Sequence, residues 1–111
     1  MSNRFKKLND LLRDEAGKML KKELEFNGVL VTVVRAVVSP TLEHATIWIS
    51  VLPESQRETV LQKINQKIYN LQQILNKRLA MRPVPKIRFE IDKTEEKAAR
   101  IEKLLQKSQN K

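Results

Sequence analysis

Apolar side chains recur at helical spacing in two long stretches of the chain. In the first, Arg4 to about Leu24, apolar positions return every three or four residues, as one buried helix face requires. The second follows the Ser55-x-x-Glu58 pattern of a helix capping box and ends before Pro83, which cannot continue a helix. Its apolar stripe consists of Val60, Leu61, Ile64, Ile68, Leu71, Leu75 and Leu79. The stripe predicts one helix of about 25 residues. Its middle, Asn65 to Asn76, is rich in Asn and Gln and allows a kink, although no glycine or proline requires one.

Shorter stretches have the composition or the alternation of β-strands. Val29 to Val38 is rich in β-branched residues and, apart from Thr32 and Arg35, apolar on both faces, which predicts a strand flanked by neighbours. Thr46 to Leu52 alternates strictly, with Ile47 and its equivalents on one face and Trp48 on the other. The short link between these strands predicts an antiparallel hairpin. Residues 86–91 alternate in the same way and predict a third strand.

The order of the elements predicts the architecture. A last amphipathic helix is expected around Ala98, Ile101, Leu104 and Leu105, which gives the order α-β-β-α-β-α. Helices with one apolar stripe bury it best against one face of a three-stranded sheet, so we expect a two-layer α+β domain. Residues 1–105 are expected to form this single domain, and 106–111 a short, frayed basic tail.

Positive charge is concentrated in two parts of the chain. The formal net charge is +9, and the sequence pI is about 10.0. Residues 1–22 hold seven Lys/Arg against three Asp/Glu, and residues 57–93 hold nine against three. Residues 23–56 are acidic, with one against four. A one-sided basic surface attracts polyanions by releasing their counterions, so nucleic acid is the expected partner. The alternatives are a lysine-rich surface that only keeps the protein soluble and an acidic protein partner.

The sequence offers little for catalysis or metal binding. The chain has no cysteine and one histidine, His44, which we interpret as an ordinary polar residue. Asp10, Asp14 and Glu15 lie on a basic helix and are better explained as charge partners than as metal ligands. We therefore expect no enzyme activity, no metal, no cofactor and no small-molecule substrate. No apolar run approaches the roughly 18 residues that span a membrane, which favours a soluble cytoplasmic protein.

Cations on the long helix and the third strand are the candidate RNA-binding groups, supplemented by the first helix. Contacts of this kind engage phosphates and position a protein without reading sequence. The candidates are Lys63, Lys67, Lys77, Arg78, Arg82, Lys86 and Arg88, with Lys6, Lys7 and Arg13. Trp48, on the face opposite the helices, is a possible stacking residue for a base. Tyr69 is expected near the rim of the apolar stripe, packed rather than exposed.

Two segments together resemble bacterial ribosome-binding factor A. The first is the hairpin from Val31 to Leu52, with Ser39-Pro40 and His44-Ala45 within it. The second runs from Leu79 to Asp92, and the later Arg100-Ile101-x-x-Leu104-Leu105 extends the match, which covers Arg4 to Leu105. The resemblance implies a KH-like fold of the type II order. It also implies an assembly factor that binds the free small (30S) ribosomal subunit and 16S rRNA and assists late 16S maturation. We expect the protein to be a monomer.

The same family replaces the usual KH loop by a helix–kink–helix with an Ala-x-Gly pattern. Aligned backwards from Arg82-Pro83-Val84-Pro85, this pattern falls on Lys67-Ile68-Tyr69, so the chain departs from it. The sequence alone does not decide whether this helix is kinked. One alternative function is a protein-interaction module that pairs through the long amphipathic helix. Sequence-specific DNA binding is a weaker alternative, since no helix-turn-helix pattern is present.

Overall fold

The computed structural model describes the backbone of residues 2–94 and the side chains from Arg4 to Thr94. The predicted last helix and the tail 106–111 lie outside the described residues. The elements are α1 (Ser2–Glu23), β1 (Leu30–Val38), β2 (His44–Leu52), the 3₁₀ helix η1 (Glu54–Gln56), α2 (Arg57–Gln66), α3 (Ile68–Arg78) and β3 (Lys86–Ile91).

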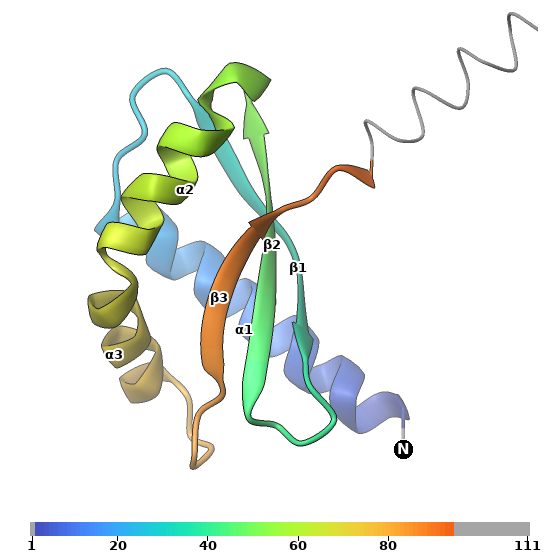
Figure 1. Cartoon of the computed structure of the whole chain (residues 1–111). Helices are drawn as coiled ribbons and strands as arrows, with labels where there is room; N and C mark the ends of the chain where they lie inside the picture. The colour runs from blue at the N-terminus through green and yellow to red at the C-terminus, as the bar shows by residue number, and fades with distance from the viewer. Residues whose placement is uncertain (1, 95–111) are drawn as a thin grey trace, which may run out of the picture.

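The described strands form one sheet in the order β1-β2-β3. β1 and β2 pair antiparallel, which confirms the predicted hairpin, and β3 adds to β2 in parallel. A parallel neighbour needs a crossover, and α2 and α3 supply it (Figure 1). The register places Trp48 of β2 between Arg35 and Glu90, so these three side chains share one face of the sheet.

β1 is an edge strand of the described sheet, so the prediction that neighbours flank it on both sides was wrong. Its register shifts between Val33 and Arg35, and beyond this irregularity only Ala36 and Val38 are buried. Val34 and Val37 are 41% and 45% exposed. The β-branched residues of this strand therefore reflect strand propensity on both faces rather than burial on both faces.

The helices cover one face of the sheet, as predicted. α1 lies behind β1 in Figure 1, whereas α2 and α3 lie beside β3. The core between the layers joins Leu12 and Met19 of α1 with Ile47 and Ile49 of β2, all at 0% exposure. The alternation in β2 explains this directly, because every second side chain points to the helix layer. The two-layer α+β prediction is thus confirmed for residues 2–94.

The long predicted helix, whose kink the sequence left undecided, is broken at Lys67, between α2 and α3. Lys67 has φ −108° and ψ 7°, and its N–H donates to the carbonyl oxygen of Ile64 at 3.0 Å, a 3₁₀-type bond. No glycine or proline causes the break. α2 packs on β2 and β3, whereas α3 packs on α1 and β3, and two shorter helices follow a twisted sheet better than one straight rod.

The predicted capping box does not form. Ser55 lies inside η1, and α2 begins only at Arg57, without a side-chain cap. The turn is closed instead by the N–H of Gln56, which donates to the carbonyl oxygen of Pro53 at 3.1 Å. The Ser-x-x-Glu pattern therefore predicted correctly that a helix starts near Ser55, but the hydrogen bonds of a capping box are absent there.

Gln72 joins α3 to the start of β3. Its amide nitrogen donates to the carbonyl oxygen of Pro85 at 3.1 Å and to Asn76 Oδ1 at 3.0 Å. Its amide oxygen accepts the N–H of Ile87 at 2.9 Å. This one side chain therefore joins α3 to the end of the following loop and to the start of β3. The sequence of the helix does not distinguish Gln72 from its other polar residues.

We expect Gln72→Ala to lower the free energy of unfolding by about 2 kcal/mol, because it leaves the Pro85 carbonyl and the Ile87 N–H without their partner in a half-buried position. Urea denaturation measures this loss. Gln73→Ala, one residue along and exposed, is the matched control and should change stability by less than about 0.5 kcal/mol. Equal effects of the two variants would contradict the role of Gln72.

Gly17 in α1 is not required by close packing. A Cβ at this position would lie 3.9 Å from Val33 Cβ, an ordinary van der Waals contact. Since alanine is the better helix former, Gly17→Ala should raise the free energy of unfolding by about 1 kcal/mol. A thermal melt tests this, and a lower melting temperature would show that this face of α1 tolerates no added atom.

Candidate nucleic-acid interface

All the charged side chains of residues 59–89, which lie between the start of α2 and the end of β3, are positive. Between Glu58 and Glu90 the chain carries no acidic residue. We call these positive side chains the α2–α3–β3 basic surface. They are Lys63, Lys67, Lys77, Arg82, Lys86 and Arg88, which are exposed, and Arg78, whose side chain is 27% exposed. Without carboxylates of its own, this segment neutralises little of its positive charge locally, which favours contact with a polyanion.

Lys67, Lys77 and Lys86 are the cations of this surface that are free to bind a ligand. Their side chains make no ion pair or hydrogen bond within the part of the chain that the structure describes. Lys67 lies at the helix break, Lys77 in the last turn of α3, and Lys86 at the start of β3. A flexible ammonium group without an internal partner can contact a phosphate at little structural cost.

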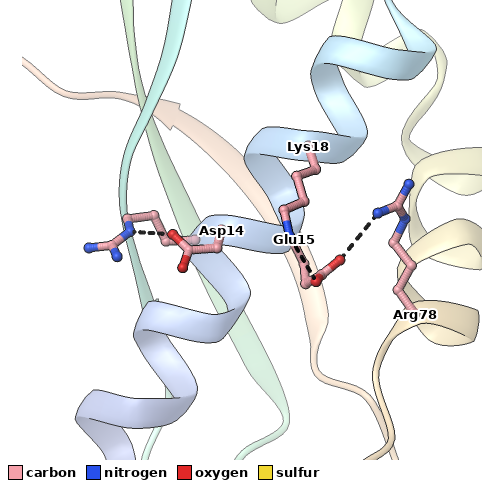
Figure 2. Close-up of polar contacts among 5 residues, drawn as sticks. Asp14, Glu15, Lys18 and Arg78 are labelled. Atoms are coloured by element: carbon pink, nitrogen blue, oxygen red, sulfur yellow. Dashed lines mark hydrogen bonds and ion pairs between the residues drawn. The ribbon is translucent and has the colours of Figure 1, made fainter.

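Arg78 is committed to a contact between helices. Its guanidinium lies 3.2 Å from Glu15 Oε2, and the two side chains are only 27% and 19% exposed (Figure 2). Glu15 also lies 3.9 Å from the ammonium of Lys18. The pair joins α3 to α1 and neutralises much of the Arg78 charge, so this residue has a structural role that sequence reasoning did not foresee.

Arg82 and Lys63 also have partners within the chain. Arg82 donates to the carbonyl oxygens of Leu79 and Met81 at 2.7 Å, and so it holds the turn that follows α3. Lys63 donates to the carbonyl oxygen of Glu25 and lies 5.2 Å from the centre of the Phe26 ring. Both cations therefore help to position the segments around them.

The open face of the sheet carries Arg88 and Trp48. Arg88 lies 3.4 Å from Glu90 and 3.3 Å from Thr46 Oγ1. The side chain of Trp48 is half-buried, and the guanidinium of Arg35 lies over its ring, 4.9 Å from the centroid. Arg35 in turn lies 3.7 Å from Asp92. Trp48 thus faces away from the helices as expected, with one face of its ring already covered by a cation.

The α1 cations do not join this surface. Lys6 and Lys7 belong to the N-terminal end of α1, which lies on the β1 side of the molecule, away from α2 and α3 (Figure 1). Arg13 lies 3.5 Å from Asp10 and 3.1 Å from Asp14. The ten predicted cations therefore occupy at least two separate regions rather than one continuous face.

Tyr69 is the residue that sequence reasoning placed wrongly. It is 74% exposed, not packed at the rim of the apolar stripe. In α3 the buried face is centred on Leu71 and Leu75, and Tyr69 lies about 200° around the helix from Leu71. A helical projection of residues 68–78 alone would have revealed this, but the stripe of the expected longer helix concealed it.

The apolar stripe of α2 and α3 is used inside the domain. Val60, Ile64, Leu71, Leu75 and Leu79 are at most 3% exposed. The helix-pairing alternative depended on this stripe being available to another helix, and the fold removes that basis. The described residues contain no cluster of His, Cys, Asp or Glu able to hold a metal ion, and none of the described helices is long and apolar enough to cross a membrane.

The chain matches known proteins over nearly its full length. The family model for ribosome-binding factor A matches residues 4–105. Ribosome-binding factor A of Akkermansia muciniphila is 30% identical over 106 residues, which cover 96% of this chain and 85% of that protein.

Solved structures show the same fold at lower sequence identity. The crystal structure of ribosome-binding factor A from Thermus thermophilus has a TM-score of 0.69 and 20% identity, covering 78% of this chain and 93% of the other. A homology model of the Thermus thermophilus factor, fitted into a cryo-EM map of its complex with the 30S subunit, has a TM-score of 0.59 and 22% identity over 74% and 92% of the two chains. These neighbours are KH-like, as the resemblance implied. On the family match over residues 4–105, this chain belongs to the ribosome-binding factor A family.

Proposed function

We propose that this chain is a ribosome assembly factor that binds the free small (30S) ribosomal subunit and assists late maturation of 16S rRNA. Membership of the ribosome-binding factor A family supports the ribosome as the partner. The relative from Thermus thermophilus has been fitted into a map of a complex with the 30S subunit. On this proposal the protein acts as a monomer in the cytoplasm, where subunits are assembled, and needs no cofactor.

The observation that carries the proposed mechanism is the absence of acidic residues between Glu58 and Glu90, on a segment that carries seven cations. We infer that the α2–α3–β3 basic surface contacts rRNA phosphates. Lys67, Lys77 and Lys86 supply charge directly, while Arg78 and Arg82 hold the helices and the following turn in place. Phosphate contacts give affinity and orientation, and RNA shape gives selectivity for the subunit.

Co-sedimentation of the purified protein with free small subunits, large subunits and joined ribosomes tests this binding. We expect retention on free small subunits that weakens steeply as salt rises. Equal retention on large subunits would reduce the protein to a nonspecific polyanion binder. Binding that does not depend on salt would contradict phosphate contacts.

The maturation step has a separate test in cells. A strain depleted of this protein should accumulate unprocessed 16S precursor and free small subunits, and expression of the intact chain should reverse both. Normal 16S processing in the depleted strain would contradict the assembly role even if the purified protein bound subunits.

A further inference from the structure

An exposed row of side chains lies along the outer face of α3. Tyr69, Gln73 and Lys77 are spaced four residues apart, which places them one above another on a helix, and all three are exposed. The row extends over about 12 Å at the helical rise of 1.5 Å per residue. It lies on the side opposite Leu71, away from the sheet.

Tyr69 has no use inside the described part of the domain. Its side chain is 74% exposed, its hydroxyl has no hydrogen-bond partner there, and no cation lies over its ring. Trp48 and Phe26 differ in this respect, since each has a cation over one face of its ring. Among the aromatic side chains with a described environment, Tyr69 therefore offers the most accessible ring for a ligand to stack on.

The surroundings of the ring favour a nucleic acid over a protein. Asn65, Gln66, Asn70 and Gln73 are exposed polar neighbours along the chain. Lys67 lies two residues before the tyrosine, and no acidic residue occurs within ten positions on either side. A protein-binding hot spot would place apolar residues around its aromatic anchor. An isolated ring among amides and ammonium groups instead suits an unpaired base and its phosphates.

We propose that the outer face of α3 binds a single-stranded RNA segment, with Tyr69 stacking on an unpaired base, Gln73 bonding to a base edge and Lys77 contacting a phosphate. The proposal rests on the proposed function and adds which structural class of RNA is bound. A ring can stack only on a base that is not already stacked in a duplex, so the expected target is a loop, a bulge or a chain end.

The test compares Tyr69→Ala and Tyr69→Phe in the full chain, with Phe5→Ala on α1 as a control that removes another exposed ring. The probes are a fluorescent single-stranded oligouridylate of about 12 nucleotides, an RNA duplex of equal length, and free small subunits. We expect Tyr69→Ala to weaken single-strand and subunit binding about 5- to 100-fold, since stacking on one base is worth that much. Tyr69→Phe and Phe5→Ala should stay within about twofold, and duplex binding should not change.

Each alternative outcome is decisive. Wild-type affinity of Tyr69→Ala for the single strand would overturn the inference, while subunit binding by the wild-type protein would leave the proposed function intact. Loss of subunit binding with unchanged oligonucleotide binding would assign Tyr69 to a protein contact and also overturn it. Failure of the wild-type protein to bind subunits at all would instead count against the proposed function. Unchanged melting temperatures identify the variants as folded.

Discussion

Replacing Lys67, Lys77 and Lys86 together by glutamine is expected to weaken binding to free small subunits about 100-fold at about 0.1 M salt, while the melting temperature stays unchanged. These lysines are exposed and have no internal partner in the described part of the chain, so their removal costs no native contact. Each phosphate contact with single-stranded RNA contributes about 0.7 to the slope of log affinity against log salt. The triple variant should therefore lower the slope by about 2.

The control removes the same charge elsewhere. Arg4, Lys6 and Lys7 are exposed cations at the N-terminal end of α1, away from α2 and α3, and their triple replacement by glutamine should cost less than about tenfold. Equal losses in the two triple variants would mean that net charge, rather than this surface, determines affinity. Arg78 and Arg82 are unsuitable for this test, because replacing them also breaks contacts to Glu15 and to the turn after α3.

Replacing Ile64 by alanine is expected to lower the free energy of unfolding by about 3 kcal/mol. Ile64 is 0% exposed in the last turn of α2, and its carbonyl oxygen accepts the Lys67 N–H at the helix break. Removing its outer atoms leaves a cavity at the point where the helix direction changes, where close packing holds the neighbours in place. Chemical denaturation followed by circular dichroism measures the loss.

Gln62→Ala, two residues before and exposed, is the control for this variant and should change stability by less than about 0.5 kcal/mol. A loss below about 1 kcal/mol in Ile64→Ala would mean that the core beneath the break is loosely packed or collapses around the smaller residue. In that case the break would not be fixed by packing at this site.

The elements with strong periodicity could be predicted from the sequence. The alternation of Thr46 to Leu52 determines which face of β2 is buried. Pro83 requires the preceding helix to end before it, and α3 does end earlier, at Arg78. The sequence left the break undecided: the resemblance placed the family's kink pattern at Lys67-Ile68-Tyr69, where the helix does break, but no glycine or proline there requires it. Packing of α2 on β2 and β3, and of α3 on α1 and β3, accompanies the break. When α3 is considered as a separate helix, Tyr69 lies on the side opposite its buried residues Leu71 and Leu75.

The candidate site was predictable as a charge distribution but not as a set of free groups. Sequence shows that residues 59–89 are cationic without acidic residues, yet it gives Lys77 and Arg78 equal weight. The structure separates them, since Arg78 contacts Glu15, 63 positions away in the chain, and Lys77 contacts no acidic group among the described residues. Such long-range partners depend on topology, which local patterns do not encode.

Placement of a single crosslinking group tests the central claim, that the face of α3 meets rRNA in the small subunit. The chain has no cysteine, so Gln73→Cys on α3 and Phe5→Cys at the N-terminal end of α1 each carry one photoreactive label. In complexes with free small subunits, the label at position 73 should crosslink to 16S rRNA, and the label at position 5 should give little or no RNA crosslink. Crosslinking of 16S rRNA from position 5 and none from position 73 would contradict the account.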